Sequence, residues 1–123
     1  MPSKKQKQPF GQYGEQLACD YLTSQGYAII TTNWHCSLGE IDIVAQKGTM
    51  TVFVEVRSRH SETTEEAFAS INKRKQIKMV AAAQEYIDSH ELDQQAWRID
   101  AIGIAVQRSG QTLIEHVEDA IGW

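Results

Sequence analysis

Gly39-Glu40-Ile41-Asp42-Ile43-Val44-Ala45 and Val52-Phe53-Val54-Glu55-Val56-Arg57 are two short apolar segments with acidic residues inside them. Each segment alternates with a period of two, which is typical of a β-strand with two different faces. Residues 46–51 contain Gly48 and are short enough to join the segments as an antiparallel hairpin. The expected apolar face comprises Ile41, Ile43, Ala45, Val52, Val54 and Val56, and the opposite face carries Glu40, Asp42, Phe53, Glu55 and Arg57.

The hairpin is expected to bring Asp42 and Glu55 together. If Ala45 pairs with Val52, the two carboxylates lie directly opposite each other, with Cβ atoms about 5 Å apart. A slip of two residues makes them diagonal neighbours at roughly 7 Å, still on one face. The pattern therefore predicts a close pair of carboxylates in either register.

Two like charges facing each other on a sheet are destabilising and need compensation. A shared proton, a cation from the protein or a divalent metal would supply it. Mg²⁺ suits the pair because it keeps waters and phosphate oxygens as its other ligands, and such a site activates water. Arg57 shares the face of Glu55 and could hold a phosphate. The alternative is an exposed face whose acids are solvated or paired with Arg57 and Arg59.

Length and composition favour one domain. At 123 residues the chain can bury one core, which we expect over residues 10–123, after a basic, disordered tail at 1–9. No apolar run approaches the length of a membrane span and the lysine-rich start lacks the apolar stretch of a signal peptide, so a cytoplasmic location is expected. Cys19 and Cys36 lack metal-binding spacing and are predicted to be reduced and structural.

Positive charge is clustered, although the formal net charge is −4. The clusters are Lys4, Lys5 and Lys7; Arg57, Arg59 and His60; and Lys73, Arg74, Lys75 and Lys78. Such clusters are usually solvated faces. Two of the three are predicted to flank the acids, which gives them more weight as contacts for a polyanion.

A first helix is predicted over residues 11–25, where apolar residues recur at helical spacing before Gly26. A strand is expected over 27–32, followed by a turn over 33–38 that leads into the acidic hairpin. Glu15 lies at the border of the helix's apolar stripe. It is either a solvated helix residue or an acid aimed over the sheet toward Asp42 and Glu55.

One long helix is predicted over residues 66–89, which contain no Pro and no Gly. One stripe of this helix consists of Lys73, Gln76, Val80, Ala83 and Ile87. The stems of Lys73 and Gln76 either snorkel from the core edge or reach over the end of the sheet, where phosphates would lie. Arg74, Lys75 and Lys78 are expected to point elsewhere on the surface.

Two further strands are predicted, over residues 97–106 and 112–117. Because a long helix precedes the first of them, that strand is expected to lie parallel to a central strand by a crossover. The fold class is therefore α/β, with an αβββαβ core, a mixed central sheet flanked by helices and an extra C-terminal strand.

This order, with a helix glutamate, an aspartate on the second strand and a Glu-x-basic pattern on the third, resembles the restriction-endonuclease-like PD-(D/E)XK nuclease superfamily. More closely, the chain resembles the YraN family of small bacterial proteins, which are similar to archaeal Holliday junction resolvases. The residues that carry this resemblance are Gly14-Glu15, Ala18, Tyr21-Leu22, Gly26-Tyr27, Asn33, 39–45, 53–57 and Arg98-Ile99-Asp100.

The resemblance implies roles for particular residues. Asp42 and Glu55 would be metal ligands, with the Val56 carbonyl a further one, and Glu15 would complete or tune the site from the helix. Arg57 stands where the superfamily most often has lysine. A guanidinium can stabilise phosphorane charge but remains protonated, so it should not act as a base.

The resemblance also implies contacts to the substrate. Lys73 and Gln76 would take the helix positions that contact phosphate and water, and Lys73 would partly replace the missing lysine. Arg59 is a further candidate for contact with nucleic acid.

The leading hypothesis is a Mg²⁺- or Mn²⁺-dependent endonuclease that cuts DNA, including branched DNA, in recombination or repair. The expected partner is nucleic acid, DNA before RNA, with no membrane, and a homodimer is left open. An alternative is a nucleic-acid-binding or adaptor protein that keeps the fold and cuts poorly or not at all. A purely protein-binding domain is the third hypothesis.

Overall fold

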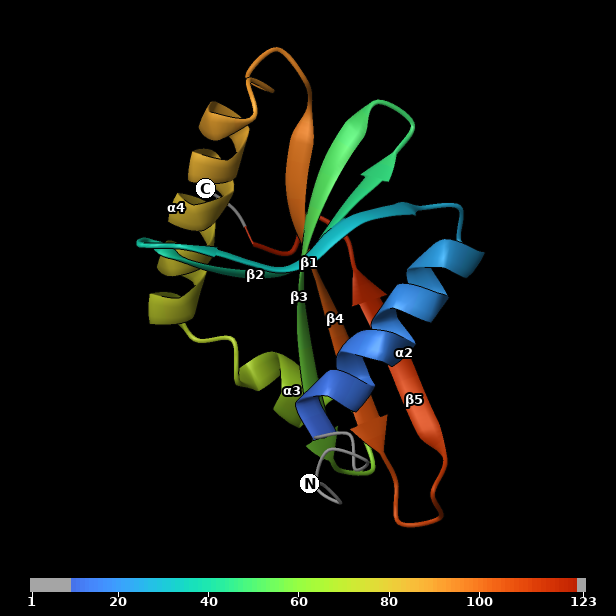
Figure 1. Cartoon of the computed structure of the whole chain (residues 1–123). Helices are drawn as coiled ribbons and strands as arrows, with labels where there is room; N and C mark the ends of the chain where they lie inside the picture. Colours follow the sequence, from blue (N-terminus) through green and yellow to red (C-terminus); the bar gives the residue numbers. More distant parts are fainter. Residues whose placement is uncertain (1–9, 122–123) are drawn as a thin grey trace, which may run out of the picture.

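The computed structural model describes residues 10–121, so the predicted tail at 1–9 lies outside the described residues. The elements, in chain order, are α2 (Phe10–Ser24), β1 (Ala28–Cys36), β2 (Gly39–Lys47), β3 (Met50–His60), α3 (Glu65–Ala69), α4 (Lys73–Ser89), β4 (Trp97–Val106) and β5 (Thr112–Val117). Figure 1 shows the strands as one twisted sheet, with α2 and α4 on opposite faces. The α/β class, the αβββαβ core and the extra C-terminal strand are confirmed.

The sheet is mixed, with strand order β1-β2-β3-β4-β5. β3 and β4 are parallel, and the other neighbouring strands are antiparallel. The segment with α3 and α4 makes the crossover that parallel neighbours require. The predicted parallel placement of the fourth strand is therefore confirmed, and β4 and β5 have their predicted bounds.

The acidic hairpin forms in the first of the two registers considered, because Ala45 pairs with Val52. The pairing continues to Lys47 opposite Met50, which leaves a two-residue turn at Gly48 and Thr49. Gly48 has a φ of 62°, a left-handed conformation that favours glycine and that tight hairpins use. The loop is therefore shorter than the predicted 46–51.

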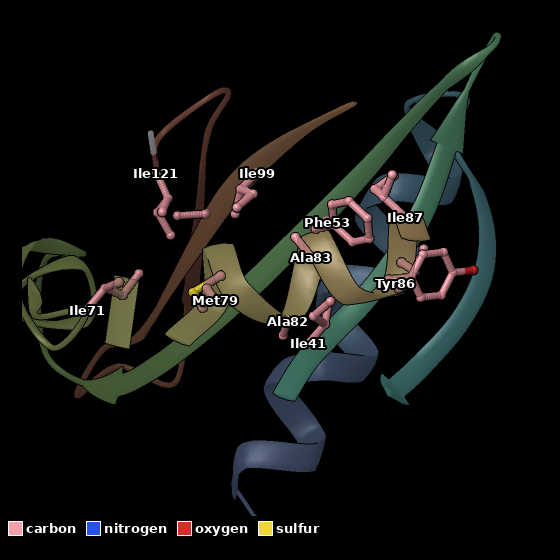
Figure 2. Packing of buried hydrophobic residues seen from close by; sticks show 12 residues of the cluster. Ile41, Phe53, Ile71, Met79, Ala82, Ala83, Tyr86, Ile87, Ile99 and Ile121 are labelled. Atoms are coloured by element: carbon pink, nitrogen blue, oxygen red, sulfur yellow. The ribbon is translucent and has the colours of Figure 1, made fainter. Parts of the chain in front are cut away.

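Both faces of the sheet bury apolar side chains. The face under α4 carries the cluster drawn in Figure 2, in which Phe53 packs edge to face with Tyr86. The face under α2 carries a second cluster, with Ile43, Val54 and Val56 packed near Leu22. Because β3 lies at the centre of the sheet and is covered on both sides, its one acidic residue, Glu55, is almost entirely buried.

The predicted turn at 33–38 is wrong, because β1 continues through Cys36 and only Ser37 and Leu38 turn. The expectation that Ile41 shares a face with Ile43 is also wrong. Ile41 packs in the α4 cluster, beside Ala82 in Figure 2, whereas Ile43 packs in the α2 cluster. The alternation reverses beside Asn33, whose φ of 53° breaks the extended backbone of the neighbouring strand.

The single helix predicted over 66–89 is also wrong, because α3 ends at Ala69 and α4 begins at Lys73. Asn72 caps the second helix, since its side chain accepts a hydrogen bond from the Lys75 N–H at 2.9 Å. Asn has low helix propensity and is a strong N-cap, so this residue was the available signal. The break lets Ile71 bury its side chain between the helices and the sheet.

Helix α2 lies close against β3 because of Gly14. A Cβ atom on residue 14 would lie 1.9 Å from the Ser58 hydroxyl oxygen and 3.2 Å from its Cβ. Glycine therefore allows this close approach, and a side chain at residue 14 would require the Ser58 hydroxyl to move. Since Glu15 is the next residue, this approach also fixes where Glu15 stands relative to the sheet.

A second buried polar cluster lies on the α2 face, around the fully buried Asp100. Its carboxylate accepts hydrogen bonds from Arg98 Nε at 2.9 Å and from the backbone N–H of Asp119 at 2.9 Å, and lies 2.8 Å from His116 Nε2. Arg98 also donates to the Tyr27 hydroxyl. The cluster joins the start of β1, β4, β5 and the segment after β5.

Candidate active site

The candidate site lies where β2 and β3 separate. Regular pairing between these strands ends at Ile43 and Val54, and Figure 1 shows the β1–β2 pair diverging from β3. At this fork the backbone N–H of Val56 donates to Asp42 Oδ2 at 2.8 Å. A carboxylate has therefore taken a donor that a carbonyl would hold in a regular ladder. The fork opens the centre of the sheet to solvent.

Asp42 and Glu55 are brought together here, as the sequence predicts, and each carboxyl group shifts the pKa of the other. Burial, and next the charge of Asp42, raise the pKa of Glu55 to about 8. Burial also raises the pKa of Asp42, against the hydrogen bond from Val56. Without a bound cation the pair therefore retains a proton at neutral pH, which is one of the compensations considered from the sequence.

Arg57 supplies a second compensation, since its Nη2 lies 2.6 Å from Glu55 Oε2. The guanidinium can donate a further hydrogen bond, because its buried Nε has no hydrogen-bond partner in the structure. A buried donor without a partner costs free energy, of order 1–3 kcal/mol. A phosphate oxygen or a water held beside Glu55 would satisfy it.

Glu15 reaches the site from α2, as the functional interpretation of that residue predicts. Burial raises its pKa, and the charges of Asp42 and Glu40 add to the effect. Asn33 Nδ2 donates to Glu15 Oε1 at 2.8 Å and opposes that rise. Glu15 therefore acts on Asp42 from α2, and it lines the same cavity as Asp42 and Glu55.

An open cavity of about 870 Å³ contains these groups. Its lining includes all four predicted catalytic residues, Glu15, Asp42, Glu55 and Arg57, together with Val56 and the predicted nucleic-acid contact Arg59. The wall on the α4 side carries Lys75, Lys78 and Met79. Acidic side chains from α2, β2 and β3 and basic side chains from β3 and α4 therefore line the same cavity.

Helix α4 presents to the cavity residues other than the two that the sequence favoured. Lys73 and Gln76 do not line the cavity, and Gln76 Nε2 donates instead to the Ile71 carbonyl. Lys75 and Lys78, predicted to point elsewhere, line it, and the charge of Lys75 acts on Glu55. The reason is that the buried face of α4 runs through Met79, Ala82 and Tyr86, and one or two turns back from these residues lie Lys75 and Lys78.

Sequence reasoning missed several other residues of the cavity. Glu40 lies two residues from Asp42, and its position on the same predicted face was a usable signal. Asn33 was quoted only as part of a motif, and nothing in its spacing showed that it would contact Glu15. His35 and Cys36 line the cavity because β1 continues past its predicted end.

The residues present suit a hard divalent cation better than zinc. Within residues 10–121 no group of three or more His, Cys, Asp and Glu side chains is arranged to hold a metal. Mg²⁺ binds through one or two carboxylates and fills its remaining positions with water, whereas zinc sites use several nitrogen or sulfur ligands. The half-buried Asp42 and the buried Glu55 both have raised pKa values, and a bound cation would supply the positive charge that favours their ionised forms.

The chain belongs to the uncharacterised protein family UPF0102, whose model matches residues 14–104. A UPF0102 protein of Chloroflexus aurantiacus is 42% identical over 123 residues, which cover 99% of this chain and 98% of that protein. A relative from Roseiflexus castenholzii is 37% identical, over 90% of this chain and 91% of that protein. A relative from Herpetosiphon aurantiacus is 35% identical, over 91% of this chain and 93% of that protein. The matched residues contain every predicted catalytic and metal-binding position.

Among solved structures, the chain is similar to Pyrococcus furiosus SfsA in complex with Ca²⁺, with a TM-score of 0.36 and 13% identity. The alignment covers 86% of this chain and 60% of that longer one. Within residues 10–121 no helix is both long and apolar enough to cross a bilayer.

Proposed function

We propose that this protein is a metal-dependent endonuclease that hydrolyses phosphodiester bonds in DNA, with branched DNA as the preferred substrate class. The observation that carries the proposal is the pair of the half-buried Asp42 and the buried Glu55, with a raised pKa on each, in an open cavity that is also lined by basic residues. The sequence resemblance to PD-(D/E)XK nucleases and to junction resolvases supports the same function.

Asp42 and Glu55 would hold Mg²⁺ or Mn²⁺, together with the Val56 carbonyl. A bound divalent ion supplies charge neutralisation and activation of water at such a site. Arg57 contributes a fixed positive charge to the phosphate, and its guanidinium stays protonated, so it stabilises charge without accepting a proton. Glu15, with its raised pKa, is the group placed to accept a proton from water.

The basic residues at the cavity wall suit the DNA backbone. Lys75, Lys78 and Arg59 give the cavity positive charge, although the chain as a whole is acidic. Contacts of this kind bind phosphates without reading sequence. Recognition by shape, as in branched DNA, is therefore the form of selectivity that this surface favours. Roles in recombination or repair follow from such a substrate.

The test is a nicking assay on branched, flapped and linear DNA, with Mg²⁺, Mn²⁺ or a chelator. Cleavage that requires metal is expected, and Glu55→Gln should abolish both cleavage and Mn²⁺ binding. Glu66→Gln is the matched control, because Glu66 is an exposed glutamate on α3, outside the cavity. If Glu55→Gln cleaves as fast as the unmodified protein, the proposed site is wrong.

A second candidate function is binding of DNA without cleavage, and Arg57 is the observation that favours it. Arginine stands at the position of the usual lysine and already pairs with Glu55. If Arg57 clamps phosphate in an active enzyme, Arg57→Lys should keep cleavage and Arg57→Ala should lose about a hundredfold in rate, or roughly 3 kcal/mol. In a binding protein neither variant creates cleavage, and Arg57→Ala lowers thermal stability because the acids lose their partner.

A further inference from the structure

Asn33 has a left-handed backbone, with a φ of 53°, in the middle of β1. Residues with side chains avoid this region, and a strand interior does not ordinarily contain it. Asparagine tolerates the conformation better than most residues. Such a strained position persists only where its surroundings over-determine it, and it points to a functional constraint.

The strained residue lies beside the acidic pair. In the register of β1 on β2, Thr32 pairs with Ile43 and Trp34 pairs with Ile41, so Asn33 and Asp42 occupy the same gap between these pairs. The side-chain alternation of both strands reverses at this gap: Ile43 packs under α2, and Ile41 packs under α4. Asn33 therefore lies opposite the place where the side-chain alternation of β2 changes, and at that place Asp42 enters the gap between β2 and β3.

The side chain of Asn33 points to the third carboxylate. Its Nδ2 donates to Glu15 Oε1 at 2.8 Å, across 18 residues of sequence and from a strand to a helix. The amide is a donor at every pH, and it occupies one oxygen of Glu15 while the other stays free. This hydrogen bond also works against the burial that raises the pKa of Glu15.

We propose that Asn33 is the positioning residue that joins Glu15 to the acidic pair, through its left-handed backbone and its amide hydrogen bond. Asparagine alone meets both needs. Glycine would adopt the backbone without a donor, aspartate would repel Glu15, and glutamine would offer the donor on a backbone that disfavours this φ. The inference rests on the proposed function, because it treats Glu15 as part of the active site.

A double-mutant cycle tests the role in catalysis. Asn33→Gly keeps the backbone conformation without strain and removes the donor, so the fold should keep its melting temperature. In the nicking assay it should lower kcat about tenfold to a hundredfold, the scale of a misplaced catalytic group, and leave KM nearly unchanged. In the background of Glu15→Gln, Asn33→Gly should have little further effect, because both changes remove one coupled unit.

A second measurement does not depend on cleavage. Carboxyl ¹³C NMR of the metal-free, full-length protein follows the titration of Glu15. Asn33→Gly should raise the pKa of Glu15, and Asn33→Asp should raise it more, since the new carboxylate is a like charge. Thr32→Ala, an exposed neighbour on β1, is the control and should leave the titration unchanged.

The two measurements separate the positioning role from the enzyme itself. A Glu15 titration that is the same in Asn33→Gly, Asn33→Asp and the unmodified protein overturns the positioning role, whatever the nicking assay gives. A loss of kcat from Asn33→Gly that is equally large with and without Glu15 also overturns it. Absence of cleavage from every variant, with the expected shifts in Glu15, refutes the proposed function while the positioning of Glu15 stands.

Discussion

The site depends on Glu55, a carboxyl group whose burial disfavours its ionised form. Glu55 lies on the central strand, is 6% exposed, and has one arginine and one aspartate as ionisable neighbours in direct contact. The guanidinium only partly offsets the cost of burial, so the pKa of Glu55 stays raised, at about 8. A residue in this state gains from any cation that enters the cavity.

We expect the metal-free protein to lose stability as the pH rises from about 4.5, the ordinary pKa of Glu55, to about 8, its folded-state pKa. Between these values the folded state binds a proton that the unfolded state has released, so stability falls with pH and levels off above pH 8. Thermal unfolding in chelator across this range measures the effect.

Glu55→Gln is the companion variant, because it carries no titrating proton at this position. It should show a weaker dependence on pH and a melting temperature at pH 8 that equals or exceeds that of the unmodified protein. Mg²⁺ added at pH 8 should stabilise the unmodified protein only. A pH profile that is the same in both proteins would exclude the raised pKa of Glu55 as the cause.

At the scale of the elements, two helices approach the fork from opposite faces and place different charges there. Helix α2 brings Glu15, and the first turns of α4 bring Lys75 and Lys78. Each placement depends on a local feature, a glycine in α2 and an asparagine cap before α4. The charge pattern of the cavity is therefore set by how the helices start and how closely they pack.

Replacing both Lys75 and Lys78 with alanine should weaken DNA binding at moderate salt and reduce the slope of log K against log salt concentration by about 1 to 2. Lys73→Ala is the matched control, a lysine of the same helix outside the cavity, and its effect should be smaller. Fluorescence anisotropy over a salt series measures both. If Lys73→Ala has the larger effect, the prediction from sequence was right about the binding face and the cavity is not where DNA lies.

Gly14→Ala should push α2 away from β3 and lower stability by about 1–3 kcal/mol, the usual cost of overpacking. The added Cβ would meet the Ser58 hydroxyl at 1.9 Å. Because Glu15 moves with the helix, nicking should fall as well. Gly11→Ala is the control for stability, since a Cβ there meets nothing within 4 Å, and it should not lower the free energy of unfolding. Equal stabilities of the two variants would contradict the close approach.

At the scale of the whole molecule, Asp100 holds together parts of the chain that are distant in sequence. Its carboxylate binds Arg98, His116 and the backbone of Asp119, and so connects β4, β5 and the segment after β5. A buried ion pair is costly to form, and removal of one partner leaves an uncompensated charge. The network thus adds little net stability, but the fold is strongly destabilised when one of its members is removed.

Asp100→Asn should destabilise the protein by about 3–5 kcal/mol, because Arg98 loses its buried counter-charge. Chemical denaturation checks the value. Asp119→Asn is the control, since its exposed side chain takes no part and only its backbone N–H contacts Asp100. A loss below 1 kcal/mol in Asp100→Asn would mean that the guanidinium finds water or Glu118 in place of Asp100.

The sequence by itself determined the order of the five strands, limited the hairpin to two registers and predicted the convergence of Asp42 and Glu55, which holds in either register. These features follow from local alternation and from a short loop, which leave few registers open. The sequence offered two interpretations of Glu15, a solvated helix residue or an acid that reaches toward Asp42 and Glu55. Only the packing of α2 showed that Glu15 lines the same cavity as those two residues.

Only the tertiary structure decided the rest of the site. Three features depend on how separate elements meet. These are the reversal of side-chain faces beside Asn33, the helix break before Lys73, and the presence of Lys75 and Lys78 at the cavity in place of Lys73 and Gln76. The sequence shows which residues of α4 share a face. Which face points toward the cavity depends on the residues buried one and two turns later in the helix. Contacts between α2, β1 and β3 likewise have no local signature, because they join residues far apart in the chain.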